Sequence, residues 1–204
     1  MVYSSTLEGF RQTLPWAKRP TKKTEVLQMK GFFTTQRLCR AGVIAALYVA
    51  LTYAFAPIAY GPLQVRPAEA LCILPIFFPE AIPALYIGCM LSNLASPYFV
   101  YDVLIGSLAT LLATLTAYMV GRFIKKEPFR FILCGLPTVI FNAVFIPLII
   151  VFLCGGAEGF ESAIIAYFTF AGSIALTEAV WVYALGAPLY SAITRLQNKR
   201  ISKK

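Results

Sequence analysis

The sequence contains no histidine, and only 13% of its 204 residues are charged. Soluble domains usually carry about 25% charged residues, so the composition argues against a water-soluble fold. Without histidine, neither a Ser–His–Asp nor a Cys–His set can form. The sequence also has no G-x-x-x-x-G-K-[ST] loop for ATP hydrolysis, and no carboxylate cluster of the kind found in a metal-dependent transferase. We therefore expect that the chain is not an enzyme.

Cysteines are few, and no two of them form a C-x-x-C pair. The five are Cys39, Cys72, Cys89, Cys134 and Cys154. In apolar surroundings a cysteine usually behaves as a small hydrophobic residue. We expect no zinc, haem or iron–sulfur site, no disulfide framework and no cofactor.

Apolar residues make up 59% of the chain, and the mean hydropathy is +0.73. They occur in runs long enough to cross a bilayer, for which a helix needs about 20 residues. This pattern predicts an all-α membrane protein with one transmembrane domain, over residues 41–196. A basic segment, 1–40, precedes the domain and a basic tail, 197–204, follows it.

The positions of the cations matter more than their sum of 18. Eight lie before residue 41, four lie between residues 122 and 130, and five lie from residue 195 onward. Only Arg66 remains. Clustering of this kind is typical of cytoplasmic flanks under the positive-inside rule, so we do not expect nucleic acid as a partner.

Four spans can be read from the uncharged runs. Arg40 to Arg66 encloses 25 residues, Asp102 to Arg122 encloses 19, and Arg130 to Glu158 encloses 27. A fourth run, from Glu161 to Arg195, encloses 33 residues and carries Glu178 near its middle.

The stretch between Glu69 and Asp102 is ambiguous, because Pro75, Pro79, Glu80 and Pro83 interrupt it. Two short legs, Ala70 to Phe78 and Ala81 to Ala95, would bring the number of spans to six. With six spans, 17 of the 18 cations lie on the cytoplasmic side of the membrane, together with both termini. With five spans, the basic loop between residues 122 and 130 and the basic tail would both face outside. A re-entrant hairpin would give the same parity as six spans and remains an alternative.

The N-terminal region has no apolar core of a signal peptide. Its basic run, Lys18 to Lys23, is compatible with a disordered tail or with contact to the anionic inner leaflet. Because Met29 begins a compact approach to the first span, residues 1–28 are interpreted either as an extension or as the result of an upstream start choice.

Small residues recur along the first span. They are Ala41, Gly42, Ala45, Ala46, Ala50 and Ala54. A helix brings such residues into a smooth stripe that permits close helix packing in lipid. The stripe fits either packing within the bundle or docking to another membrane protein.

Polar side chains in and near the apolar runs are the candidate ligand site, because charge at membrane depth is costly and usually functional. We expect an outer mouth with two deeper groups below it. The mouth comprises Gln64, Arg66, Glu69, Asn93 and Asp102, and the deeper groups are Asn142 and Glu178. Carboxylates, amides and nearby aromatic rings suit a small, planar, hydrogen-bonding solute.

Structural roles are the alternatives for three of these polar residues. Glu178 would be protonated or paired with Arg66, and Asn142 would only join two helices. Glu80 is interpreted as a charge at the start of a helix rather than as a ligand contact.

Three motifs resemble the QueT family of substrate-binding S components of energy-coupling factor transporters. They run from Tyr60 to Leu71, from Ile87 to Asn93 and from Asp102 to Ala113, within a resemblance over about residues 29–196. The link from Ser96 to Tyr101 departs from the shorter, glycine-richer form expected.

The resemblance implies a six-helix bundle in the cell membrane that captures a queuosine precursor, such as queuine or its aminomethyl precursor, outside the cell. It also implies docking through the first helix onto a membrane coupling subunit, with two ATPases powering release inwards. Glu69, Asp102 or Glu178 would then accept hydrogen bonds from the 7-deazaguanine. A proton-coupled secondary transporter, an S component for another vitamin and a membrane scaffold are the competing hypotheses.

Overall fold

The computed structural model describes residues 34–59, 65–124, 126–127 and 129–201, and the described segments are helices and short connections without a β-strand. The chain divides into two units, Met1–Leu38 and Cys39–Lys204. Only residues 34–38 of the first unit are described, so most of the predicted basic segment lies outside the described residues, including its 1–28 extension.

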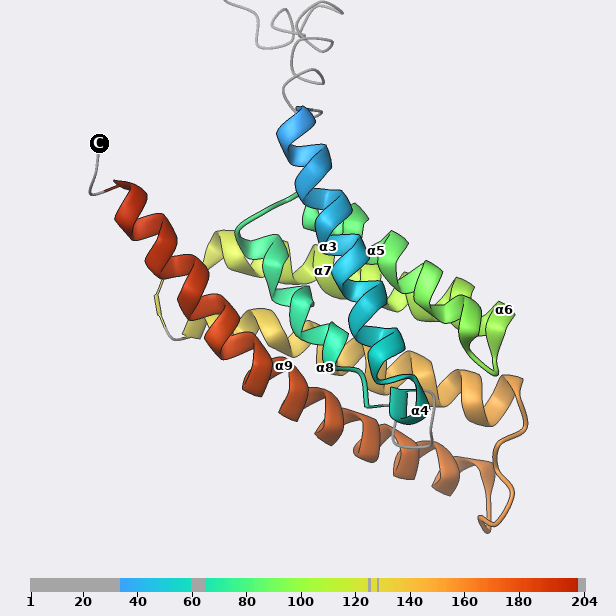
Figure 1. The fold of residues 1–204 in the computed structure, drawn as a ribbon. Coiled ribbons are helices and arrows are strands. Elements are labelled where there is room, and N and C mark those ends of the chain that lie inside the picture. The colour runs from blue at the N-terminus through green and yellow to red at the C-terminus, as the bar shows by residue number, and fades with distance from the viewer. Residues whose placement is uncertain (1–33, 60–64, 125, 128, 202–204) are drawn as a thin grey trace, which may run out of the picture. The chain divides into compact units, whose positions relative to one another are not determined.

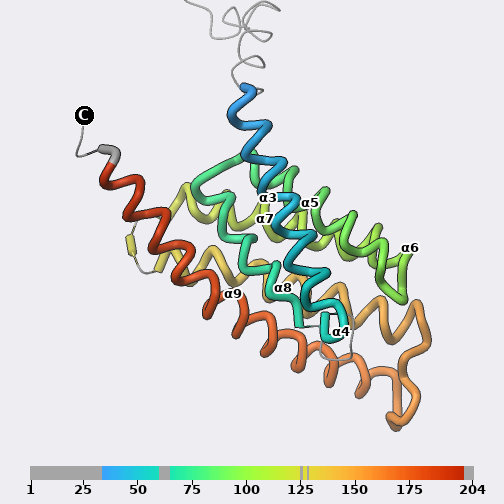
Figure 2. Tube along the Cα trace, viewed as in Figure 1, coloured from blue at the N-terminus to red at the C-terminus, as the bar shows by residue number. Residues whose placement is uncertain are grey.

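Figures 1 and 2 show the course of the chain from blue to red. The helices are α3 (Thr35–Ala54), α4 (Ala56–Ala59), the 3₁₀-helix η2 (Pro67–Ile76), α5 (Ala81–Ser92) with the 3₁₀ turn η3 (Asn93–Ala95), α6 (Phe99–Tyr101), the π-turn η4 (Asp102–Gly106), α7 (Ser107–Phe123), α8 (Phe129–Leu148), the π-turn η5 (Ile149–Leu153) and α9 (Ala163–Ile201).

Four of these helical segments are long and apolar enough to cross a membrane: Thr35–Ala54, Phe99–Phe123, Phe129–Leu153 and Ala163–Lys199. The shortest has 20 residues, which gives about 30 Å at 1.5 Å per residue, the thickness of a bilayer core. The all-helical fold is thereby confirmed.

The ambiguous stretch forms two short helices. The second follows the predicted leg, since α5 and η3 together run from Ala81 to Ala95. The first begins at Pro67 and ends at Ile76, because Pro67 starts the helix and Pro75 removes a backbone donor near its end. Neither is long enough by itself to count among the candidate spans.

Within the second unit, α8 packs against both α7 and α9, and η2 packs against α7, α8 and α9. Figure 1 shows η2 and α5 on one side of these three long helices. The helix α3 approaches α5 at Gly88, where an added Cβ would lie 3.1 Å from the Ala45 carbonyl oxygen and from the Tyr48 Cβ. Glycine is thus required here by a close approach of two backbones.

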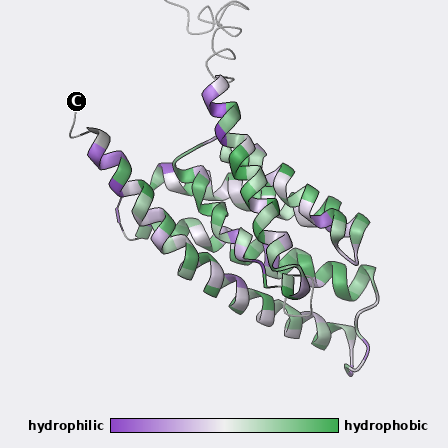
Figure 3. Cartoon of the chain, in the orientation of Figure 1, coloured by the Kyte–Doolittle hydropathy of each residue, from purple (hydrophilic) through white to green (hydrophobic). Residues whose placement is uncertain are grey.

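Apolar side chains cover the outside of the second unit, while many polar ones are inside. Leu104, Phe123, Phe168 and Leu176 are each at least 64% exposed. Figure 3 shows hydrophobic colour over most of the helical surface, with hydrophilic residues at the C-terminal end of α9. An apolar exterior is what a lipid solvent requires.

Contacts distinguish the two ends of η2. Near its C-terminal end, Arg40 pairs with Glu80 and stacks over Phe78, and Arg130 donates to the Ile76 carbonyl. At its N-terminal end, Arg66 lies 3.8 Å from the Asp102 carboxylate. Ten residues of 3₁₀-helix rise about 20 Å, so these contacts lie at opposite ends of the bundle.

Candidate functional site

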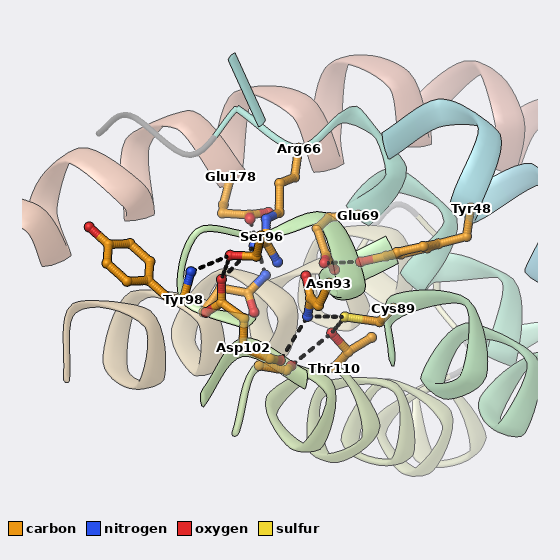
Figure 4. Close-up of polar contacts among 12 residues, drawn as sticks. Tyr48, Arg66, Glu69, Cys89, Asn93, Ser96, Tyr98, Asp102, Thr110 and Glu178 are labelled. Carbon is orange, nitrogen blue, oxygen red and sulfur yellow. Dashed lines mark hydrogen bonds and ion pairs between the residues drawn. The ribbon is translucent and has the colours of Figure 1, made fainter. Parts of the chain in front are cut away.

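Six of the seven predicted ligand residues are buried, and their side chains interact in one polar cluster. The buried residues are Arg66, Glu69, Asn93, Asp102, Asn142 and Glu178, each no more than 3% exposed. Figure 4 shows five of them converging from separate elements, together with Tyr48 of α3. The seventh, Gln64, lies outside the described residues.

The helix η2 presents Glu69 and Cys72 on one face, and Arg66 is the residue just before the helix. A 3₁₀-helix has three residues per turn, so side chains three apart lie above one another. Arg66, Glu69 and Cys72 follow this spacing, and the Cys72 thiol donates to Glu69 Oε2 at 3.0 Å. The 3₁₀ geometry of η2 therefore directs the Glu69 side chain toward the inside of the bundle.

Glu69 has hydrogen-bond donors for both of its oxygens. The Tyr48 hydroxyl donates to Oε1 at 2.5 Å, and Cys72 serves Oε2. Sequence reasoning missed Tyr48. Its signal was its position four residues from both Ile44 and Thr52, on the face of α3 that is buried.

Asp102 begins the π-turn η4, and three residues hold it. The Ser96 hydroxyl donates to Oδ2, Arg66 pairs with the same oxygen, and Asn93 Nδ2 donates to the Asp102 carbonyl at 2.8 Å. π-turns inside α-helices are frequent at functional sites. The link from Ser96 to Tyr101 thus supplies a contact to a predicted site residue.

Glu178 and Asn142 join α9 to α8, because Asn142 Nδ2 donates to Glu178 Oε1 at 3.1 Å. Both side chains are 1% exposed. Glu178 Oε2 has no hydrogen-bond partner, and neither has Asn93 Oδ1. Two buried acceptors are therefore unsatisfied in the cluster, which is uncommon in folded proteins.

The cluster carries more negative than positive formal charge. Among the described residues it brings three carboxylates, Glu69, Asp102 and Glu178, together with the guanidinium of Arg66, which lies 3.8 Å from the Asp102 carboxylate (Figure 4). Burial lowers the pKa of Arg66, but the nearby Asp102 carboxylate raises it and the net shift is upward. Arg66 therefore remains a cation. No group of three potential metal ligands occurs among the described residues.

Three further residues, Glu80, Phe141 and Trp181, contact neighbouring side chains. Glu80 precedes the first residue of α5, the position that its interpretation as a helix-start charge predicted, and it also pairs with Arg40. Phe141 packs against Phe145, and Trp181 packs against Phe55.

The small-residue stripe divides between two faces of α3. Gly42, Ala46, Ala50 and Ala54 are exposed, and nothing lies within 4 Å of a Cβ added at Gly42. Ala41 and Ala45 are half-buried and pack against the core formed with η2 and α5. The first four residues are thus open to a partner, whereas Ala41 and Ala45 serve packing within the bundle.

Known proteins are similar to this chain over most of the helical region. The model of the QueT transporter family matches residues 38–195. A Lactococcus lactis subsp. cremoris protein named "Queuosine precursor transporter QueT" is 41% identical over 98 residues, which are 47% of this chain and 57% of the relative. No solved structure matches. Family and relative are both transporters, which confirms the expectation that the chain is not an enzyme.

Proposed function

We propose that this chain, which belongs to the QueT transporter family, is the substrate-binding membrane subunit of an energy-coupling factor importer and captures a queuosine precursor of the 7-deazaguanine class. The observation that carries the proposal is the buried polar cluster. Six predicted residues from η2, η3, η4, α8 and α9 meet inside an apolar bundle, and two of their acceptors are left for hydrogen-bond donors of a ligand.

Six membrane crossings, with both termini in the cytoplasm, are part of the proposal. The contacts at the C-terminal end of η2 involve Arg40, Arg130 and the turn at Glu80. The contacts at its other end involve the single isolated cation, Arg66. This division supports two short crossing legs, η2 and α5, and a polar cluster toward the outer side of the cell membrane.

Docking of a membrane coupling subunit is assigned to the exposed stripe of Gly42, Ala46, Ala50 and Ala54. Small side chains let two helix backbones approach closely, and this contact replaces the hydrophobic force that is lacking between helices in lipid. Tyr48 lies on the opposite, buried face of the same helix and bonds Glu69. A single helix therefore links the proposed docking face to the proposed ligand site.

Reconstitution tests the transport mode. Purified chain in liposomes should bind a radiolabelled 7-deazaguanine but accumulate none of it, with or without a pH gradient, since its sequence carries no G-x-x-x-x-G-K-[ST] loop for ATP hydrolysis. Addition of the coupling subunit and its ATPases should start ATP-dependent uptake. Uptake by the chain alone, driven by a pH gradient, would favour a secondary transporter in which Glu178 carries the proton.

A further inference from the structure

Three buried carboxylates surround Arg66, and their hydrogen bonds differ. Both oxygens of Glu69 accept hydrogen bonds, from Tyr48 and from Cys72. Asp102 Oδ2 accepts from Ser96 and pairs with Arg66. Neither Glu69 nor Asp102 has a buried carboxylate oxygen left without a partner in the described part of the chain, so these two carboxylates hold the site in shape.

Glu178 differs from both, because Asn142 serves only its Oε1 and Oε2 has no partner. The residue is 1% exposed, so bulk water does not satisfy that oxygen. A buried carboxylate oxygen without a donor costs free energy comparable to a lost charged hydrogen bond. A ligand that brings a donor to this atom recovers that cost.

The net formal charge of the polar cluster indicates which kind of ligand group donates to Glu178. Glu69, Asp102 and Glu178 together outnumber the single guanidinium among the described residues of the cluster. A cationic ligand group balances this excess, whereas a neutral N–H group does not. The other unsatisfied acceptor, Asn93 Oδ1, is an uncharged amide oxygen and suits a neutral N–H on a heterocycle.

From these contacts we infer that Glu178 is the specificity-determining carboxylate and that it receives a protonated amine of the ligand, while Glu69 and Asp102 are positioning residues. This inference rests on the proposed function for the ligand class. Within that class it selects precursors with a basic side-chain amine, such as 7-aminomethyl-7-deazaguanine or queuine. It disfavours the neutral 7-cyano-7-deazaguanine, which shares the same heterocycle.

Calorimetric titration of the purified full-length chain with the aminomethyl and the cyano compounds tests the inference. The wild type should bind the aminomethyl compound at least about tenfold more tightly than the cyano compound. The variant Glu178→Gln keeps the shape and removes the charge. It should weaken binding of the aminomethyl compound by about 10- to 100-fold, and change binding of the cyano compound by less than about threefold.

Two other variants serve as controls for the effect of Glu178→Gln. Asn93→Ala should weaken both compounds by similar factors, because both carry the ring N–H groups. Glu69→Gln should lower the thermal midpoint and weaken both compounds alike. Equal affinity of the wild type for the two compounds would overturn the inference. An equal loss of affinity for both compounds in Glu178→Gln would also overturn it. Absence of binding by either compound would instead overturn the proposed function.

Discussion

At the residue scale, the hydrogen bond from Tyr48 to Glu69 shows how the cluster depends on a side chain outside the recognisable motifs. We predict that Tyr48→Phe lowers the free energy of unfolding by about 1–3 kcal/mol, because a buried carboxylate oxygen loses its donor. The measurement is the thermal midpoint of the purified protein in detergent.

Tyr53→Phe is the matched control on the same helix. Tyr53 is 43% exposed, and its hydroxyl is 3.5 Å from the Leu91 carbonyl, a long and weak hydrogen bond. Its removal should leave the midpoint nearly unchanged. Equal effects of the two substitutions would contradict the role given to Tyr48.

Single residues also show which parts of the candidate site could be predicted from the sequence. Charged and amide residues in apolar runs could be found because they are costly in a membrane, and six of them do meet in one cluster. Their partners Tyr48, Cys72 and Ser96 could not be found in this way. Tyrosine, cysteine and serine are ordinary in membrane helices, and only the three-dimensional arrangement brings these side chains to the carboxylates.

At the scale of elements, the approach of α3 to α5 depends on Gly88. We predict that Gly88→Ala destabilises the protein by about 1–3 kcal/mol through overpacking, because its Cβ would lie 3.1 Å from Ala45 and Tyr48 atoms. Gly42→Ala on the exposed face of α3 is the control. It meets nothing within 4 Å and should not lower the thermal midpoint.

The exposed face of α3 supports a second prediction at this scale. Ala46→Leu combined with Ala50→Leu should abolish co-purification with the coupling subunit, since the larger side chains keep the partner helix away. Ligand binding by the isolated chain should be retained, because both residues are exposed.

Ala184→Leu, at an exposed position of α9, is the control for a general effect of added leucine and should not impair co-purification. Loss of ligand binding together with co-purification in the α3 variant would instead assign the stripe to packing within the bundle.

Helix type was harder to infer than helix position. The uncharged runs of the sequence indicated where the long helices lie, and three candidate spans follow the predicted runs closely, while the first begins at Thr35, before its run, and ends at Ala54. The 3₁₀ geometry of η2 could not be read from them. It follows from prolines at both ends and from the packing of η2 against α7, α8 and α9, and it is what aligns Glu69 and Cys72.

At the scale of the whole molecule, the number of crossings sets the side on which each loop lies. With six crossings, Cys154 after η5 faces outside and Cys39 in α3 faces the cytoplasm. With five, both face the cytoplasm. We therefore predict that a membrane-impermeant maleimide labels Cys154 in intact cells, but labels Cys39 only after permeabilisation.

Single-cysteine variants make this measurement clear, since Cys72, Cys89 and Cys134 are buried. Burial raises the pKa of the Cys154 thiol, and the Asp102 carboxylate raises it further. A raised pKa leaves less of the reactive thiolate near neutral pH, so labelling of Cys154 should accelerate as the pH is increased. Labelling of Cys154 only after permeabilisation would contradict six crossings.

The central claim is that this chain alone holds the binding site for a 7-deazaguanine. Calorimetric titration of the purified full-length protein with 7-aminomethyl-7-deazaguanine, in the absence of any partner subunit, tests it most directly. We predict saturable binding with one site per chain. A titration without binding heat, together with an unchanged thermal midpoint in excess ligand, would contradict the claim.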